Sequence, residues 1–220
     1  LATWTARFLG LEIGLSDPLF HLLIGGYKLL VFLGYLLSVS RLPDMRRVFE
    51  YHGAEHKTIH AYEQGLPLTV ENVRAQTTLH PRCGTTFLVV VVMLSIIFGS
   101  VITPLLLPNA EGFLGQVQVL ALRIAMLPLI AAASFELQRL SARFCTTGPL
   151  RVFLWPGFLF QKITTREPDD AQIEIAIAAM QAAAWRESVG NDAPSDEAPL
   201  IFPNFDGFVE ALPALRGKAA

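Results

Sequence analysis

Three long apolar stretches constrain this chain more than any other feature of its sequence. They run over about 18–39, 87–107 and 117–135. A helix needs roughly 20 apolar residues to cross about 30 Å of hydrocarbon, and each stretch is long enough to do so. Because backbone polar groups find no water inside a bilayer, such stretches cross it as helices. The sequence therefore predicts an all-α integral membrane protein with three visible transmembrane helices in contact with the lipid bilayer.

The composition agrees with a membrane domain and argues against a nucleic-acid-binding protein. Hydrophobic residues make up 52% of the chain and charged residues only 16%, which is few for the surface of a soluble domain. The formal net charge is -2 and no basic stripe is visible, so no nucleic-acid partner is expected. Two cysteines are too few for a disulfide framework, and they suit a reducing compartment or a metal site.

Lysines and arginines gather on one side of the predicted spans. The connection 40–86 and the segment after the third span both carry several, whereas the short connection 108–116 carries none. Cytoplasmic loops are enriched in these residues, so we expect the histidine-rich connection and the C-terminus in the cytoplasm. Three spans then leave the start of the chain outside, which suggests an earlier span.

The remaining segments divide the chain further. Residues 1–16 form an N-terminal lead-in to the membrane domain, 17–187. Within it, residues 149–160 are apolar but too short to cross, so a re-entrant or interfacial segment is expected. An apolar face at helical spacing predicts a C-terminal amphipathic helix over 168–186. The polar segment 188–220 is expected to be a flexible tail with a docking element for protein partners in a membrane complex.

Four of the five histidines lie close together in the connection: His52, His56, His60 and His80. His52 and His56 are four residues apart, so on a helix both imidazoles project from one face, as two ligands of one metal require. His80 and Cys83 add an imidazole and a thiol just before the second span. His52, His56, His80 and Cys83 are therefore the candidate ligands of a divalent metal, with zinc as the first choice.

Glu55 completes the string H-x-x-E-H, the inverted form of a metalloprotease motif. It stands beside His56, where a carboxylate can act as the catalytic base toward a metal-bound water. His60 is turned about 80° from His52 around a helix, so it is expected outside the ligand set. The residues expected around the ligands, or holding an anionic substrate group, are Lys57, His60, Glu63, Arg82, Glu136, Arg139 and Arg166.

The histidines also admit a structural interpretation. H-x-x-E-H is short, and Gly53 weakens helix propensity inside it. A hydrogen-bonded network of the histidines with Glu55, Glu63 and Arg82 would hold the connection in place without a metal. The chain would then be a non-enzymatic membrane subunit or scaffold of a larger complex. A metal-dependent hydrolase and a structural subunit both stay open.

Two polar features lie inside the predicted spans. Lys28 stands near the middle of the first span, and a charge at that depth is a functional candidate. An ion pair with a neighbouring helix, or snorkelling of the side chain, would explain it as well. Ser95, Gly99 and Thr103 recur every fourth residue on the second span, a stripe that favours close helix packing. A transporter is a weaker alternative, because no internal repeat is visible.

Several longer strings resemble the YqhQ-like family of bacterial integral membrane proteins. They are spread over residues 40–185 and read Arg41-Leu-Pro-Asp44, Tyr51-His-Gly-Ala-Glu-His-Lys57, Tyr62-Glu63, Leu79-His-Pro-Arg-Cys-Gly84 and Thr164-Thr-Arg-Glu-Pro-Asp-Asp170. The resemblance implies a location in the bacterial inner (cytoplasmic) membrane. The family is uncharacterised, and its label, predicted metal-dependent enzyme, implies roles for His52, Glu55, His56, His80 and Cys83. The tail after about residue 187 lies outside the resemblance.

Overall fold

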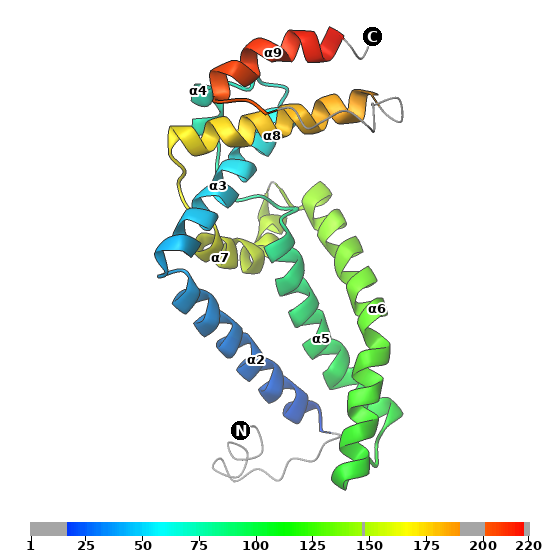
Figure 1. Cartoon of the computed structure of the whole chain (residues 1–220). Coiled ribbons are helices and arrows are strands. Elements are labelled where there is room, and N and C mark those ends of the chain that lie inside the picture. The colour runs from blue at the N-terminus through cyan, green and yellow to red at the C-terminus, as the bar shows by residue number, and fades with distance from the viewer. Residues whose placement is uncertain (1–16, 147, 190–200, 218–220) are drawn as a thin grey trace. The chain divides into compact units, whose positions relative to one another are not determined.

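The structure is a computed structural model that describes residues 17–146, 148–189 and 201–217 (Figure 1). Within these ranges the regular elements are helices, with no strand among them. The all-α class predicted from the sequence is thereby confirmed for the described part of the chain. Two predicted segments, the lead-in 1–16 and the portion 190–200 of the tail, lie outside the described residues.

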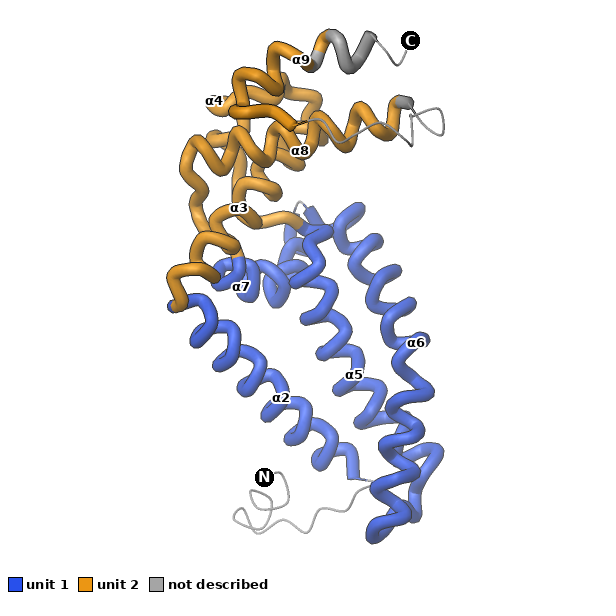
Figure 2. The backbone as a smooth tube through the Cα atoms, viewed as in Figure 1, with its two compact units in different colours: residues 1–41, 81–164 blue, residues 42–80, 165–220 orange. Residues whose placement is uncertain are grey.

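The chain folds as two compact units, drawn in different colours in Figure 2. Unit 1 combines residues 1–41 with 81–164, and unit 2 combines residues 42–80 with 165–220. Unit 1 therefore holds the three apolar stretches. Unit 2 holds most of the histidine-rich connection together with the C-terminal part of the chain.

Among its described residues, unit 1 contains three helices that are long and apolar enough to cross a membrane: α2 (Pro18–Val39), α5 (Gly84–Leu106) and α6 (Gly112–Phe144). The first two match the predicted spans to within a few residues, whereas α6 extends beyond the third span at both ends. Large apolar side chains stay exposed along all three; Leu30 and Phe113 are 65% and 82% exposed. A surface of this kind is unfavourable in water and suits lipid.

Local sequence determines where α2 begins. Asp17 caps α2, because its carboxylate accepts a hydrogen bond of 2.8 Å from the backbone N–H of Leu19, and Pro18 occupies the first turn. At the start of α5, the side-chain amide of Gln138 on α6 donates to the carbonyl of Cys83 at 2.9 Å. This buried hydrogen bond joins α6 to the start of α5.

The segment predicted as re-entrant or interfacial, residues 149–160, forms two short helices in unit 1. A 3₁₀ helix, η1 (Pro149–Leu154), leads into α7 (Trp155–Thr164). Gln161 on α7 is fully buried, and its amide donates to the hydroxyl of Thr86 on α5 at 2.6 Å. The segment therefore packs against α5, and its position in a membrane stays a prediction.

The described residues of unit 2 form four helices: α3 (Pro43–Glu63), α4 (Val70–Arg74), α8 (Asp170–Val189) and α9 (Phe205–Gly217). The longer helices α3 and α8 pack together, α4 contacts both, and α9 contacts α8. Side chains from the first three helices form the buried core of this unit, which consists of Ala54, Ala61, Val73, Ile173 and Ile177. Segments far apart in the sequence thus share one hydrophobic core.

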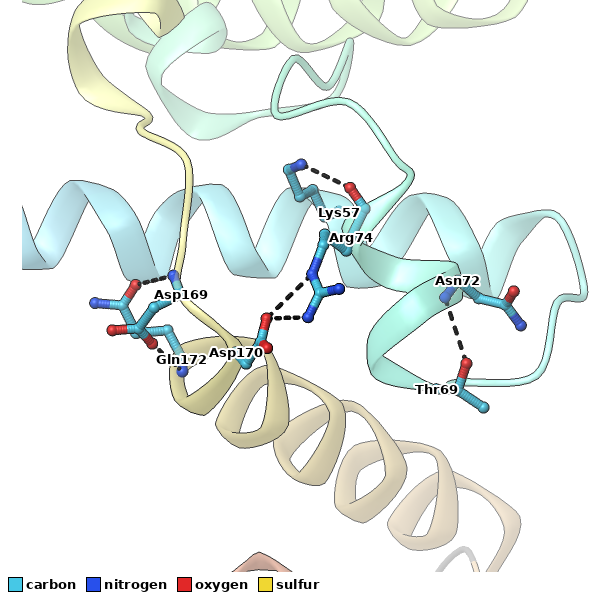
Figure 3. Close-up of polar contacts among 7 residues, drawn as sticks. All are labelled: Lys57, Thr69, Asn72, Arg74, Asp169, Asp170 and Gln172. Atoms are coloured by element: carbon cyan, nitrogen blue, oxygen red, sulfur yellow. Dashed lines mark hydrogen bonds and ion pairs between the residues drawn. The ribbon is translucent and has the colours of Figure 1, made fainter.

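The predicted amphipathic helix, 168–186, corresponds to α8, which begins with a capping box. The side chain of Gln172 accepts from the backbone N–H of Asp169 at 2.9 Å, and the Asp169 carboxylate accepts from the N–H of Gln172 at 2.8 Å (Figure 3). Gln172 also donates to Glu50 on α3 at 3.0 Å. Ile173 follows immediately and is fully buried. The first turn of α8 is therefore held against α3 by polar and apolar contacts.

The C-terminal end of the predicted tail, 188–220, contains α9. Phe205 packs against the core of unit 2, and Phe208 is buried, with its ring centroid 5.5 Å from that of Phe202. These aromatic contacts attach α9 to unit 2. A docking role for this element stays a prediction.

Candidate metal centre

One face of α3 carries a row of potential metal ligands. His52, His56, His60 and Glu63 are separated by four, four and three residues along this continuous helix. Positions three or four residues apart lie above one another on a helix, so these four side chains share a face. The observed helix α3 therefore places His60 and Glu63 in the same row as His52 and His56.

Gly53 sits inside this helix because another segment of unit 2 lies directly against it. A Cβ built on Gly53 would overlap the backbone carbonyl oxygen of Arg166. The backbone N–H of Arg166 also donates to the carbonyl of Phe49 at 2.9 Å. The backbone before α8 therefore rests on α3, and a glycine leaves room for it. Arg166, which the sequence placed around the ligands, reaches α3 through these backbone contacts.

The loop that precedes His80 offers two consecutive carbonyls to the histidines of α3. Nδ1 of His56 lies 2.5 Å from the carbonyl oxygen of Thr78, and Nε2 of His60 lies 2.9 Å from that of Leu79. A carbonyl can only accept, so each of these nitrogens carries the hydrogen. In the neutral form of each ring, the other nitrogen holds the lone pair, which is the arrangement in which a histidine binds a metal.

The side chains of His60, Glu63 and His80 bring one donor atom each within 4.8 Å of one another. His80 is buried; its ring centroid lies 4.8 Å from that of His60, and its Nε2 lies 3.5 Å from the Glu63 carboxylate. The ring of His56 lies 5.7 Å from that of His80, and the ring of His52 lies 4.4 Å from that of His56. All four histidines of the predicted cluster thus form one row in unit 2.

Burial lowers the pKa of His80 from its ordinary value to about 4. Repulsion from His60 and His56 also lowers this pKa, whereas the carboxylate of Glu63 opposes the shift. His80 is therefore neutral at pH 7. A neutral imidazole is the form that binds a metal ion.

The donor set of His60, Glu63 and His80 fits a divalent metal. Two imidazoles and one carboxylate are the protein ligands of a common class of catalytic zinc site, in which the fourth position is left for water or substrate. Glu63 is exposed while His80 is buried, so the group has one closed side and one open side. The arrangement can hold a metal and leave it accessible.

Glu55, the predicted catalytic base, lies on a different face of α3. Together with Tyr51 and Thr58 it lines a pocket of about 350 Å³ between α3 and α8. The α8 side of this pocket is apolar and is formed by Ile175, Ala176, Ala179, Met180 and Ala183. The structure does not bring Glu55 into the group of His60, Glu63 and His80. Its role as a base stays a prediction.

Unit 1 holds four of the predicted site residues: Arg82, Cys83, Glu136 and Arg139. Cys83 is buried at the N-cap of α5, with its sulfur 3.1 Å from the hydroxyl of Thr85. Glu136 and Arg139 form an ion pair of 3.0 Å along α6, and Arg82 lines a pocket with Arg139. The metal-ligand role of Cys83, and the outer-shell roles of the other three, stay predictions.

Lys57 was predicted near the ligands, and the structure shows it joining three parts of unit 2. Its ammonium group donates to the carbonyl of Arg74 at the end of α4 at 3.0 Å (Figure 3). It also pairs with Glu167, ahead of α8, at 2.7 Å. The side chain of Lys57 is only 4% exposed, whereas that of Glu167 is 75% exposed. The ion pair is therefore screened by water, and the buried hydrogen bond contributes more.

Replacing Lys57 with methionine is expected to lower the free energy of unfolding of unit 2 by about 2 kcal/mol, because a buried hydrogen bond from a charged donor is lost. The measurement is hydrogen exchange by mass spectrometry, followed on peptides of α3 and α4. Glu167→Gln is the matched control, and it should change stability by less than about 1 kcal/mol because that residue is exposed. Equal losses in the two variants would contradict the assignment.

The sequence prediction placed His60 and Glu63 outside the ligand set, and the structure shows how they meet His80. They are three residues apart, so their side chains neighbour each other on α3. The loop 75–80 then returns His80 to that turn of the helix, as the Leu79 contact shows. The spacing His60-x-x-Glu63 could have predicted from the sequence that these two side chains are neighbours. No pattern in the sequence indicated that the loop 75–80 brings His80 back to them.

Comparison with known proteins gives the family of the chain. The family model DUF1385, described as a protein of unknown function, matches residues 3–186. A curated relative, "Uncharacterized protein YqhQ" of Bacillus subtilis (strain 168), is 41% identical over 151 residues. That match covers 69% of this chain and 45% of the relative, so the chain spans less than half the length of that protein. No solved structure matches. The chain therefore belongs to the DUF1385 family, and its resemblance to YqhQ is confirmed.

Proposed function

We propose that this chain forms a membrane metalloprotein with hydrolytic activity, in which His60, Glu63 and His80 hold a divalent metal, zinc first among the candidates. The observation that carries the proposal is the approach of their three donor atoms to within 4.8 Å of one another. Three protein ligands leave a coordination position for water or substrate, which is the property that separates catalytic from structural zinc sites.

The surrounding residues have distinct parts in this proposal. The carbonyl of Leu79 orients the ring of His60, and burial keeps His80 neutral and closes one side of the site. Glu63 marks the exposed side, from which a substrate would approach. A bound metal would lower the pKa of a coordinated water to near 7. The role of Glu55 as the catalytic base stays a prediction that this ligand set does not use, because Glu55 lies on another face of α3.

His52, His56 and Cys83 remain candidate ligands beside this set. The tautomer of His56 is fixed by the carbonyl of Thr78 in the same way as that of His60 is fixed by Leu79, so its Nε2 can bind a metal.

We place the protein in the bacterial inner membrane, with the histidine segment and the C-terminus in the cytoplasm. Three helices of sufficient length and hydropathy support the membrane location. The distribution of lysine and arginine supports the orientation. A bacterial relative supports the type of membrane.

A non-enzymatic subunit is the second candidate, and one observation favours it. The contacts of His56 and His60 with Thr78 and Leu79 hold the loop on α3 without a metal. In this alternative the C-terminal tail would bind protein partners in a membrane complex, and the histidine row is structural.

Cobalt substitution separates the two candidates. We expect Co²⁺ bound to the full chain in detergent micelles to give a visible absorption spectrum that changes when acetohydroxamate is added, because an open coordination position accepts the added ligand. His60→Ala should lose the cobalt bands, and His21→Ala, a histidine of unit 1, should keep them. An absorption spectrum that stays unchanged when acetohydroxamate is added would favour the structural subunit. Failure of the chain to bind cobalt would contradict the metal site itself.

A further inference from the structure

The three apolar helices of unit 1 surround a pocket that carries positive charge. Its volume is about 160 Å³. The polar side chains that line it come from all three helices: His21 and Lys28 from α2, Ser95 and Thr103 from α5, and Arg123 from α6. The rest of the lining is largely apolar. The pocket therefore places two cationic side chains, Lys28 and Arg123, beside a largely apolar surface.

The two cations of the pocket are not neutralised by the described residues around them. Arg123 donates to Nδ1 of His21 at 2.8 Å, and a ring nitrogen that accepts this hydrogen bond belongs to a neutral imidazole. His21 is buried, so it orients the guanidinium without removing its charge. No aspartate or glutamate is found among the residues that line the pocket. Lys28 and Arg123 therefore leave a net positive charge inside the helix bundle.

The depth of these charges makes an anionic partner favourable. Lys28 lies near the middle of α2, and Arg123 lies a third of the way along α6. A charged side chain at the centre of a membrane span is unfavourable unless it is paired or reaches water. The Lys28 side chain is exposed and that of Arg123 is half-buried, so a ligand can approach both from the same pocket.

Small side chains keep one wall of the pocket open. Ser95, Gly99 and Thr103 form the stripe on α5 that the sequence suggested for helix packing, and all three line the pocket. Gly99 faces the ring of His21, whose Nδ1 would lie 3.9 Å from a Cβ at that position. The stripe therefore borders the cationic group in addition to packing against α2.

We propose that this pocket binds the phosphate or carboxylate group of an anionic ligand, with Lys28 and Arg123 as its cationic contacts and His21 as a positioning residue. A cavity of about 150 Å³ holds a molecule of the size of benzene, so the pocket accepts one oxyanionic group and not a whole lipid. The apolar lining suits the beginning of an attached hydrocarbon chain. The oxyanion can come from an anionic lipid or from free phosphate. The proposal does not depend on the metal centre.

Binding to the purified full chain in neutral detergent tests the proposal. The probes are phosphatidylglycerol, phosphatidylcholine and inorganic phosphate, and bound lipid is measured by native mass spectrometry. We expect phosphatidylglycerol to bind, and Lys28→Met and Arg123→Met each to weaken it by about tenfold or more, because a charge-assisted hydrogen bond is lost. Arg41→Met removes the same charge from the segment after α2, outside the pocket, and should change affinity by less than twofold. Lys28→Arg keeps the charge and should retain binding.

The probes distinguish the two sources of the oxyanion. Preference for phosphatidylglycerol over phosphatidylcholine, lost in Lys28→Met and Arg123→Met, supports a lipid headgroup. Binding of inorganic phosphate with the same dependence on the two variants, and no lipid preference, supports a free oxyanion. The proposal would be overturned if the wild-type protein showed no preference for phosphatidylglycerol over phosphatidylcholine and did not bind phosphate. This outcome is measured on the wild-type protein alone, so it does not depend on whether the variants fold. Equal losses in Arg41→Met would also overturn it.

Discussion

Gly53→Ala is expected to destabilise unit 2 by about 3 kcal/mol, at the upper end of the usual cost of overpacking. The added methyl group would overlap the carbonyl oxygen of Arg166, which is backbone and cannot rotate away as a side chain would. The backbone of Arg166 is also held by its hydrogen bond to Phe49, so either α3 must shift or this contact must break. The higher helix propensity of alanine recovers only about 1 kcal/mol of this loss.

Hydrogen exchange by mass spectrometry measures this effect on the full chain. Peptides of α3 and α8 should exchange faster in Gly53→Ala, whereas peptides of α2 and α5 should keep their protection. Gly26→Ala is the matched control, because it makes the same substitution in a helix where a Cβ meets no atom within 4 Å. Unchanged protection of α3 and α8 in Gly53→Ala would show that the contact with Arg166 does not restrict this position.

His60→Ala and His80→Ala are each expected to weaken metal binding by more than about 100-fold. Partners that merely orient a ligand contribute about 10- to 100-fold, and loss of a ligand itself costs more. The measurement is competition of each variant with a chromophoric zinc chelator. His21→Ala is the control, since His21 lies in unit 1. A larger loss in His52→Ala than in His60→Ala would contradict the proposed ligand set and favour the pair predicted from H-x-x-E-H.

Sequence reasoning predicted the membrane helices because their signal is local. A long apolar stretch must form a helix to satisfy its own backbone in lipid, and α2 and α5 match the predicted spans closely. The division into two units was not predicted. It depends on α8 returning to α3 across more than a hundred residues, through contacts such as that of Gln172 with Glu50. No pattern within either segment indicates this partner.

The candidate site was predicted only in part, because local spacing is readable from the sequence and long-range packing is not. The spacing of His52 and His56 gives a shared helix face from the sequence alone. His60 was excluded from the predicted ligand set because of its angle from His52. In the structure its partners are Glu63 and His80, so its angle from His52 does not matter. The place of Glu55 depends on which face of α3 meets α8, and only the packing of the two helices decides that.

X-ray absorption at the zinc edge, measured on the zinc-loaded full chain, identifies the atoms that bind the metal. We expect one tightly bound zinc per chain that is lost in His80→Ala, with nitrogen and oxygen neighbours at about 2.0–2.2 Å. A sulfur neighbour at about 2.3 Å would instead place Cys83 in the ligand set and contradict the set of His60, Glu63 and His80. Failure of the wild-type chain to hold zinc after loading without chelator would contradict the metal centre altogether.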